Sequence, residues 1–386
     1  MPSFCNFKTE LNKVLFEGDS FYREVILNRP TKLNSLDYEV ISLMLKNFRD
    51  FETDSTVKFV ILKANGRAFS AGGDVVSIVS SMITGHWCFG ARFYKKQFNL
   101  DYLLATYKKP LLPLIDGIVM GGGAGLCMNG RFRIVTEKAV FAMPEASIGL
   151  FPDVGASHFL SRLPGNFGEY LGLTGGRLNG AEMLACGLAT HFLFSKDLSL
   201  LETALKTLPS SDMTIIYQVI NKFAQKPKLK QDTIYQTQRL ETINKCFSKD
   251  TVEEILLALE NEVKNNPEIW INKAINSMKA ASPTSLKITL RSIRAGRLQN
   301  LKLCLTREYT ICCNVLRATV SNDLYEGSRA MLFDKDKKPK WEPSKLELVS
   351  KEMVDRYFNG IDEDDWKYLQ IPERSVTSMD VLMPKL

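Results

Sequence analysis

The chain has 386 residues, of which 45% are hydrophobic and 24% charged, an ordinary composition for a globular protein. Its 50 Lys and Arg against 43 Asp and Glu give a formal charge of +7, which suits an anionic ligand but does not by itself predict binding to nucleic acid. The eight cysteines include no C-x-x-C pair, which argues against a zinc site and against a disulfide framework.

The first half of the chain alternates predicted strands with predicted helices. Apolar residues at helical spacing predict a helix over 36–48. Short strands are predicted at 14–16, 22–27, 59–62, 111–115, 132–135 and 140–141. This alternation is typical of an α/β protein with loops at the ends of buried strands.

The segment 111–128 is nearly uncharged and is just long enough to suggest a membrane span. It contains Pro113 and five glycines, however, and it begins with a strand-like run. We therefore expect a buried strand, a glycine loop and a helix here, and no membrane-spanning segment.

After about residue 200 the predicted structure becomes mostly helical. A capping box formed by Thr251 and Glu254 predicts the start of one helix. Apolar stripes predict two more helices, over 286–293 and over 301–316. We interpret these stripes as packing faces rather than as parts of a ligand site.

Several familiar catalytic and nucleotide-binding motifs are absent from the sequence. Histidine is scarce, with three residues, and no G-x-S-x-G string is present, so a Ser-His-Asp hydrolase is disfavoured. Neither G-x-G-x-x-G nor G-x-x-x-x-G-K-[ST] occurs, so NAD and ATP are not predicted as ligands.

Two glycine-rich loops, at 71–74 and 121–123, each lie between a predicted strand and a predicted helix. Glycine lets a backbone N–H approach a ligand closely, and a helix N-terminus adds partial positive charge. Two such N–H groups that meet at one oxygen would form an oxyanion hole for a thioester or an enolate. The alternative is that both strings are ordinary turn glycines.

Two carboxylates follow in apolar surroundings, Glu145 after a Met-Pro pair and Asp153 after a Phe-Pro pair. A carboxylate among apolar neighbours has a raised pKa unless something pairs it, and it can then act as an acid or base near neutral pH. The alternative is that each caps a helix or forms an ion pair with Arg131, Arg133 or Arg162.

These strings, in this order, resemble the crotonase (enoyl-CoA hydratase/isomerase) superfamily. Within it they resemble the 3-hydroxyisobutyryl-CoA hydrolase branch, and their sequence is most similar to that of the plant peroxisomal members. The resemblance covers about residues 12–345, and its most specific stretch runs over 130–165. The other matching strings are Asn28-Arg29-Pro30, Asn34-Ser35-Leu36, Phe69 to Asp74, Asp116-Gly117, Met120 to Gly123, Ser282 to Lys287 and Pro339-Lys340-Trp341.

The resemblance implies an α/β fold, with a crotonase-like spiral of ββα units and the acyl-CoA site over 12–205 and a mostly helical C-terminal region over 206–386. The implied activity is that of a thioesterase that hydrolyses 3-hydroxyisobutyryl-CoA, or a similar short β-hydroxyacyl-CoA, in valine catabolism. CoA enters as part of the substrate, and we predict no metal and no other cofactor. Homo-oligomer formation is compatible with the sequence.

The site residues of the family carry over onto matching positions of this chain. Gly73 and Gly122 would donate their N–H groups to the thioester carbonyl. Glu145 would attack the thioester or activate water, and Asp153 would hold the hydroxyl group of the substrate or assist the water.

Further positions bear on the binding of CoA and of the acyl group. CoA would lie near Ala71, with its phosphates near basic side chains such as Lys32. The family commonly has a glutamate that helps to form the substrate pocket. This chain has Gln97 at the matching position, and its amide group cannot ionise. Hydratases of the family use a glutamate three positions after the oxyanion glycine. The matching residue here is Gly125, so hydratase activity is disfavoured.

Two alternatives to a thioesterase stay open on the sequence. An enoyl-CoA isomerase of the same fold needs only one base, which Glu145 would supply. A non-catalytic CoA-binding or RNA-binding protein is compatible with Gln97 and with the positive charge. We expect an enzyme, and no nucleic-acid partner.

The last three residues, Pro384-Lys385-Leu386, are similar to the S-K-L peroxisomal address, with proline in place of the small residue. Together with the resemblance to plant peroxisomal members, they predict a peroxisomal location and recognition by the peroxisomal import receptor, with the cytoplasm as the alternative. The first 20 residues carry five charged side chains and no apolar run, so no secretory signal is predicted.

Overall fold

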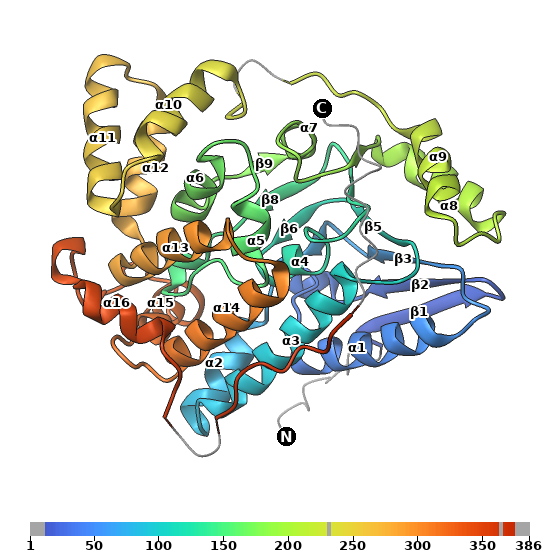
Figure 1. Cartoon of the computed structure of the whole chain (residues 1–386), viewed down its shortest axis with the longest axis horizontal. Coiled ribbons are helices and arrows are strands. Elements are labelled where there is room, and N and C mark those ends of the chain that lie inside the picture. Colours follow the sequence, from blue (N-terminus) through green and yellow to red (C-terminus); the bar gives the residue numbers. More distant parts are fainter. Residues whose placement is uncertain (1–11, 230–232, 363–365, 375–386) are drawn as a thin grey trace, which may run out of the picture.

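The computed structural model describes residues 12–229, 233–362 and 366–374, and Figure 1 shows the course of the chain. The tripeptide Pro384-Lys385-Leu386 lies outside the described residues, so the peroxisomal address stays a prediction. None of the helices within the described ranges is long and apolar enough to cross a membrane. The segment 111–128 forms two strands, where the sequence analysis predicts one, and a short helix at the predicted glycine loop.

Two β-sheets form the centre of the N-terminal half. The larger has the strand order β1-β2-β3-β5-β7-β10, with an antiparallel β1–β2 hairpin and parallel pairs beyond it. The smaller has the order β4-β6-β8-β9 and is parallel except for β9. The strands of the larger sheet are, in that order, Val14–Asp19, Tyr22–Leu27, Phe59–Ala64, Leu111–Ile115, Ile134–Val135 and His191–Phe192. Those of the smaller sheet are Ala68–Ser70, Ile118–Met120, Val140–Ala142 and Leu178–Asn179.

The strands predicted from the sequence are confirmed, but β7 is shorter than expected. It begins at Ile134, whereas the apolar pattern predicts a strand from 132. The N–H of Arg133 donates to the Oγ1 atom of Thr190 at 2.8 Å and not to a neighbouring strand, so the ladder starts one residue later.

Short crossings connect the two sheets and repeat along the chain. β3 leads to β4, β5 to β6 and β7 to β8, each through a few residues. Gly117 makes the second crossing possible, because its φ is +106° and a Cβ atom there would lie 2.3 Å from the carbonyl oxygen of Arg67. A helix then follows each pair of strands. Because β4 and β6 are parallel neighbours, the loops that follow them emerge at the same edge of the smaller sheet.

Helices complete the N-terminal half and form most of the C-terminal half, as predicted. In the first half they are α1 Tyr38–Thr53, α2 Val75–Thr84, α3 Cys88–Ala105, α4 Gly122–Gly125, α5 Ala156–Leu160, α6 Phe167–Thr174, α7 Gly180–Ala185 and α8 Leu198–Lys206. They continue with α9 Met213–Phe223, α10 Thr237–Phe247, α11 Val252–Asn265, α12 Ile269–Ala280, α13 Pro283–Gly296, α14 Leu301–Leu316, α15 Asp323–Ser328 and α16 Lys351–Phe358. The predicted capping box is confirmed at the start of α11, where Thr251 and Glu254 bond reciprocally at 3.2 and 3.1 Å.

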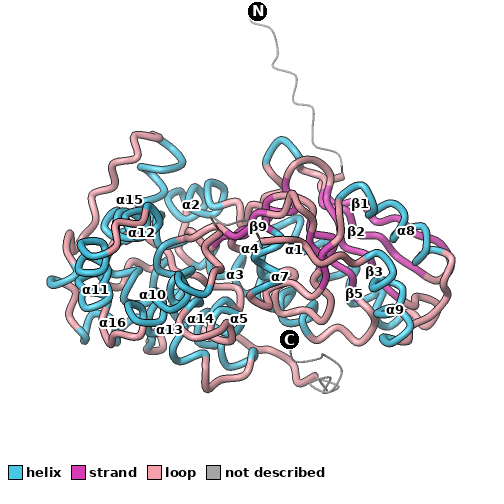
Figure 2. The backbone as a smooth tube through the Cα atoms, turned by 90° about the horizontal axis from the view of Figure 1, so that it is seen from above, coloured by secondary structure: helices cyan, strands magenta, loops and turns pink. Residues whose placement is uncertain are grey.

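The C-terminal helices cover one side of the core that contains the strands. Figure 2 shows the strands gathered toward one end of the molecule, and α10 to α13, α15 and α16 toward the other. α14 packs along α3, and α13 packs against α5 and α6. The segment 143–155, which contains both predicted carboxylates, is held against these helices, since the N–H of Ser282 donates to the carbonyl oxygen of Ala146 at 3.1 Å.

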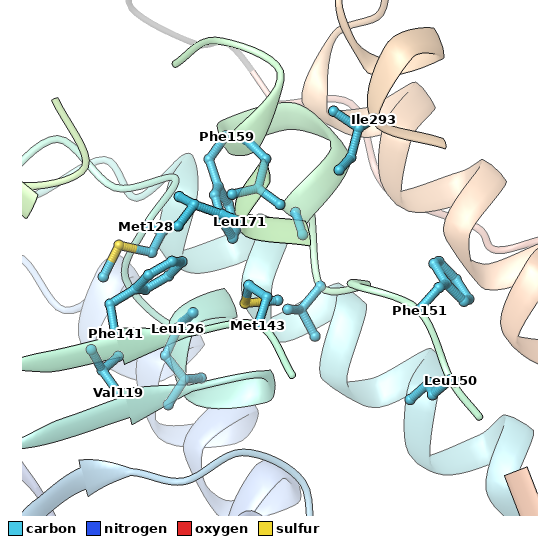
Figure 3. Packing of buried hydrophobic residues seen from close by; sticks show 14 of the residues in the cluster. Val119, Leu126, Met128, Phe141, Met143, Leu150, Phe151, Phe159, Leu171 and Ile293 are labelled. Carbon is cyan, nitrogen blue, oxygen red and sulfur yellow. The ribbon is translucent and has the colours of Figure 1, made fainter. Parts of the chain in front are cut away.

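Large apolar side chains pack on both sides of this segment, as Figure 3 shows. Phe141 of β8 and Phe159 of α5 meet edge to face, with ring centroids 6.3 Å apart. Phe151, which lies between the two carboxylates in sequence, is fully buried. Each such side chain stabilises the fold by about 1.5–3 kcal/mol through burial, so the backbone around both carboxylates is firmly placed.

The crossing of α13 over α5 depends on a glycine. A Cβ atom at Gly296 would lie 1.9 Å from the carbonyl oxygen of Ser157. We predict that Gly296→Ala lowers the free energy of unfolding by about 1–3 kcal/mol, because α13 has to move away from α5. Calorimetric melting measures this change. The control Leu298→Ala, at a side chain that is 94% exposed, should melt like the wild type. Unchanged melting of Gly296→Ala would contradict the crossing.

Candidate active site

The first glycine loop is fixed by a backbone bridge to the residues before α1. The N–H of Leu36 donates to the carbonyl oxygen of Gly72 at 2.8 Å, and the N–H of Asp74 donates to the carbonyl oxygen of Leu36 at 2.8 Å. In this parallel bridge the neighbours of Gly73 make the hydrogen bonds, so the N–H of Gly73 points to the opposite side. Among the described residues this N–H has no hydrogen-bond partner.

Two side chains that carry the family resemblance brace this loop. The Nδ2 atom of Asn34 donates to the carbonyl oxygen of Ala68 at 2.7 Å, which anchors the preceding strand β4. The Nη2 atom of Arg29 pairs with Asp74 at 3.2 Å, and Asp74 also caps α2 by accepting the N–H of Ser77. The strings around Asn34 and Arg29 therefore act on the site by holding the first loop in place.

The second glycine loop brings another N–H to the same place. Gly121 has a φ of +49° and a ψ of −126°, and a Cβ atom there would lie 2.8 Å from the Oε1 atom of Glu145. Gly122 is the first residue of α4, a position whose N–H has no partner within its helix. A Cβ atom on Gly122 would lie 3.2 Å from the backbone nitrogen of Gly73, so the two loops adjoin with Glu145 beside them.

These loops border a cavity of about 120 Å³. Six of the seven site residues predicted from the sequence line it: Ala71, Gly73, Gln97, Gly122, Glu145 and Asp153. The rest of its wall is largely apolar, with Val75, Phe93, Met120, Ile148, Leu150 and Val154 among its residues. The arrangement thus places two backbone donors and two carboxyl groups around one small apolar space.

Lys32, the seventh predicted residue, lies outside this cavity. It is exposed and ends the 3₁₀ helix Pro30–Lys32. The next residue, Leu33, accepts the N–H of Ala71 at 2.9 Å through its carbonyl oxygen. Lys32 therefore belongs to the outer side of the first loop, and its contact with a phosphate of CoA stays a prediction.

Glu145 is buried without a compensating charge. Its side chain is 6% exposed, and its Oε2 atom has no hydrogen-bond partner among the described residues. Within the same part of the chain it neither caps a helix nor pairs with any of the three arginines considered above. Burial raises the pKa of Glu145 well above its ordinary value, and the nearby charge of Asp153 raises it further.

Asp153 is the second buried carboxyl group of the cavity. It is 4% exposed and accepts a weak hydrogen bond from the Sγ atom of Cys312 at 3.8 Å. Burial raises its pKa to about 8, with a further contribution from the charge of Glu308. Asp153 therefore keeps its proton at neutral pH in the free protein and can donate a hydrogen bond.

Gln97 occupies the cavity wall in a defined orientation. It is 1% exposed, and its Nε2 atom donates to the Oδ1 atom of Asp101 at 2.7 Å, one helical turn along α3. This bond directs the amide group, and it leaves Oε1 without a partner among the described residues. The glutamine thus offers a neutral acceptor where the family commonly has a carboxylate.

The environment of Gly125 explains why a hydratase-type glutamate is absent there. A Cβ atom on Gly125 would lie 2.6 Å from the Cβ atom of Val154 and 3.0 Å from the Oδ1 atom of Asp101. No side chain fits in this space, so a second glutamate cannot enter the cavity from α4. Among the described residues, no group of three or more His, Cys, Asp or Glu side chains is arranged to hold a metal ion.

Three residues of the site were not predicted from the sequence. Asp101, Glu308 and Cys312 lie beneath the cavity and are buried, and the first two are acidic. The available signal was an acidic residue on the apolar stripe of a helix, as at Glu308 within the stripe 301–316. That stripe is confirmed as a packing face, yet through Glu308 and Cys312 it also contacts Asp153 and the turn that follows it, whereas Asp101 lies on α3.

Comparison with known proteins defines the class to which this fold and site belong. Residues 22–358 match the family model described as enoyl-CoA hydratase/isomerase, so the chain belongs to this family, the crotonase superfamily. The crystal structure of a carnitinyl-CoA dehydratase from Mycobacterium thermoresistibile has a TM-score of 0.84 and 32% sequence identity, covering 94% of this chain and 100% of that chain.

Within the family, the chain is similar over nearly its whole length to 3-hydroxyisobutyryl-CoA hydrolases. It is 52% identical over 365 residues to the probable 3-hydroxyisobutyryl-CoA hydrolase 3 of Arabidopsis thaliana, which covers 94% of this chain and 96% of the relative. It is 40% identical over 365 residues to the mitochondrial 3-hydroxyisobutyryl-CoA hydrolase of Gallus gallus, covering 94% and 93%. The predicted family, its hydrolase branch and the α/β crotonase fold are confirmed.

Removal of the buried carboxyl group should stabilise the fold at neutral and higher pH. The pKa of Asp153 is about 8 in the folded chain, whereas an unfolded aspartate has a pKa of about 3.9. Between these values unfolding releases a proton, so stability falls as the pH rises. We predict that Asp153→Asn is more stable than the wild type at pH 8, by on the order of 2 kcal/mol, and that the difference shrinks toward pH 4.

Calorimetric melting across this pH range measures the difference. Glu347→Gln, at an exposed side chain, is the matched control and should follow the wild type at every pH. If Asp153→Asn melts below the wild type at pH 8, the raised pKa of Asp153 is contradicted.

Proposed function

We propose that the chain hydrolyses the thioester of 3-hydroxyisobutyryl-CoA to the free acid and CoA. The observation that carries this proposal is the position of Glu145, which lies beside two backbone N–H donors, from Gly73 and Gly122, in a small cavity that also contains Asp153. The identity of the acyl group in this proposal comes from the names of the relatives, which are 3-hydroxyisobutyryl-CoA hydrolases.

In this proposal the two glycines and the two carboxyl groups have separate roles. The thioester oxygen accepts hydrogen bonds from the N–H groups of Gly73 and Gly122, which stabilise the negative charge of the tetrahedral intermediate. Glu145 either attacks the carbonyl carbon or removes a proton from the attacking water. Asp153 in its protonated form donates to the hydroxyl group of the substrate or assists the water. The C–S bond then breaks and CoA leaves as the thiolate. If Glu145 has attacked, water hydrolyses the resulting mixed anhydride, which releases the free acid and restores the carboxylate of Glu145. No cofactor takes part in these steps.

The cavity favours a short acyl chain. Its volume is about 120 Å³, and Phe93, Ile148 and Leu150 are among the side chains of its wall. A branched four-carbon acyl group packs against these side chains, whereas a fatty acyl chain would need more space. Hydrolysis of this ester belongs to valine breakdown, and a peroxisomal location remains our proposal for this chain.

The isomerase alternative shares the oxyanion hole and the base. It moves a proton from C2 of the acyl group and leaves the thioester intact. The presence of Asp153 as a second buried acid favours hydrolysis, because isomerisation needs a single base. Exchange of the C2 proton for deuterium in heavy water without CoA release would identify an isomerase.

Release of CoA is the first test. We predict that the wild type releases CoA from 3-hydroxyisobutyryl-CoA, and that Glu145→Gln lowers kcat/KM by about 10²–10⁴-fold because the amide cannot take a proton. A thiol reagent follows the reaction, and the exposed variant Glu347→Gln should retain full activity. A wild type that binds the ester but releases no CoA would reject the hydrolase in favour of the isomerase or of a non-catalytic binding protein.

Discrimination between substrates tests the role of Asp153. We predict that the wild type hydrolyses isobutyryl-CoA about 10–100-fold less efficiently than 3-hydroxyisobutyryl-CoA, because the buried carboxyl group loses its hydroxyl partner. Asp153→Asn should reduce this ratio. The measurement is kcat/KM for both esters with both proteins. An unchanged ratio in the variant would show that Asp153 does not contact the hydroxyl group.

A further inference from the structure

A buried glutamate from the C-terminal region reaches the turn that follows Asp153. Glu308 lies on α14 and is fully buried. Its Oε2 atom accepts the N–H of Gly155 at 2.7 Å, and its Oε1 atom accepts the N–H of Ser157 at 3.0 Å together with the hydroxyl group of Ser157. One side chain, more than 150 residues away in sequence, thus binds three donors of a single turn.

This turn has a backbone conformation that needs support. Val154 has a φ of +55°, in the left-handed region that a β-branched residue rarely adopts. Gly155, the next residue, has a φ of +80°. The carbonyl oxygen of Asp153 accepts the N–H of Ala156 at 2.8 Å, which closes the turn from within. Strain of this kind persists only where surrounding groups hold it, and the carboxylate of Glu308 is placed to do so.

The hydrogen bonds to Glu308 favour its ionised form. Both oxygen atoms accept backbone N–H groups, an arrangement that stabilises a carboxylate. Arg307 donates from its Nη2 atom to the hydroxyl oxygen of Ser157 at 2.7 Å, which turns the hydroxyl hydrogen toward Glu308. Burial raises the pKa of Glu308 above its ordinary value, and these hydrogen bonds and the charge of Arg307 limit that rise.

We propose that Glu308 is a positioning residue for Asp153: its carboxylate holds the strained turn 153–157, so that the side chain of Asp153 enters the cavity, and its negative charge faces that side chain. The inference rests on the proposed function, because it gives a role to a carboxyl group of the hydrolytic site. The raised pKa of Asp153 agrees with it, since the charge of Glu308 follows burial as its cause.

Other ionisable groups also face Asp153, and they belong to each element packed around it. They are Glu145 before α5, Tyr94 and Asp101 on α3, and Glu308 and Cys312 on α14. Of these groups, Glu308 is the one whose two carboxylate oxygens both accept backbone N–H groups. Replacement of Glu308 by a neutral residue should therefore remove a negative charge near Asp153, which replacement of a neutral group would not do.

The test compares the pH profiles of three proteins with 3-hydroxyisobutyryl-CoA as substrate. The pH limb that belongs to Asp153 is first identified by its loss in Asp153→Asn. We expect Glu308→Gln to lower kcat by about 10²-fold, because its amide nitrogen faces an N–H donor and the turn shifts. We also expect the limb to move to lower pH by roughly one unit, because the loss of a negative charge makes Asp153 easier to ionise.

Two further variants separate charge from position. Glu308→Asp keeps the charge but is too short to bind both N–H groups, so kcat should fall while the limb stays in place. It also provides a test if Glu308→Gln fails to fold. Glu169→Gln is the matched control, since Glu169 on α6 is 1% exposed and pairs with Arg297 rather than with the turn 153–157. The pH limb that belongs to Asp153 should stay in place in Glu169→Gln.

The outcomes distinguish this inference from the proposed function. If the wild type hydrolyses the ester and the limb of Glu308→Gln stays at the wild-type pH, the positioning role is overturned and the hydrolase stands. If the wild type releases no CoA, the proposed function fails. The titration of Asp153 is then followed by carbon-13 NMR of labelled aspartate, which needs no turnover. A shift to lower pH in Glu308→Gln supports the positioning role, and an unshifted titration overturns it.

Discussion

Burial of Glu145 and Asp153 together in one small, largely apolar cavity governs how the rest of the chain is arranged. Within the described residues neither carboxyl group has a cationic partner, so burial is the main cause of their raised pKa. The helices that bury these side chains are therefore part of the chemistry of the site, and α3 and α14 pack directly against each other beside it.

The two halves of the chain contribute different parts of this site. The repeated crossings between the sheets bring the ends of β4 and β6 together, and those ends supply the N–H groups of Gly73 and Gly122. Fixed donors of this kind need no reorganisation during the reaction. The C-terminal half supplies enclosure and support, because Glu308 and Cys312 on α14 contact the turn and the side chain of Asp153. A site built in this way needs the C-terminal helices as much as the sheets.

The features that the sequence analysis predicted are those with local signals. The strands, the glycine loops and the capping box of α11 each depend on a few adjacent residues, and the structure contains all of them. Glu145 and Asp153 could be singled out because their neighbours along the chain are apolar. For Glu308 the local signal was only its place on an apolar helical stripe, which does not reveal its partners in the turn 153–157, and Asp101 acts from behind the side chain of Gln97. Whether an arginine pairs with Glu145 also depends on packing between residues that are far apart in sequence, so the sequence left that alternative open.

Burial keeps the carboxyl group of Asp153 protonated near neutral pH, and infrared spectroscopy detects this protonation state. A protonated carboxyl group absorbs apart from a carboxylate, so a difference spectrum between the wild type and Asp153→Asn isolates this side chain. We expect a carboxylic-acid band in this difference spectrum that disappears with a midpoint near the pKa of about 8. A difference spectrum with only a carboxylate band at pH 6 would show that Asp153 is already ionised and would overturn this conclusion.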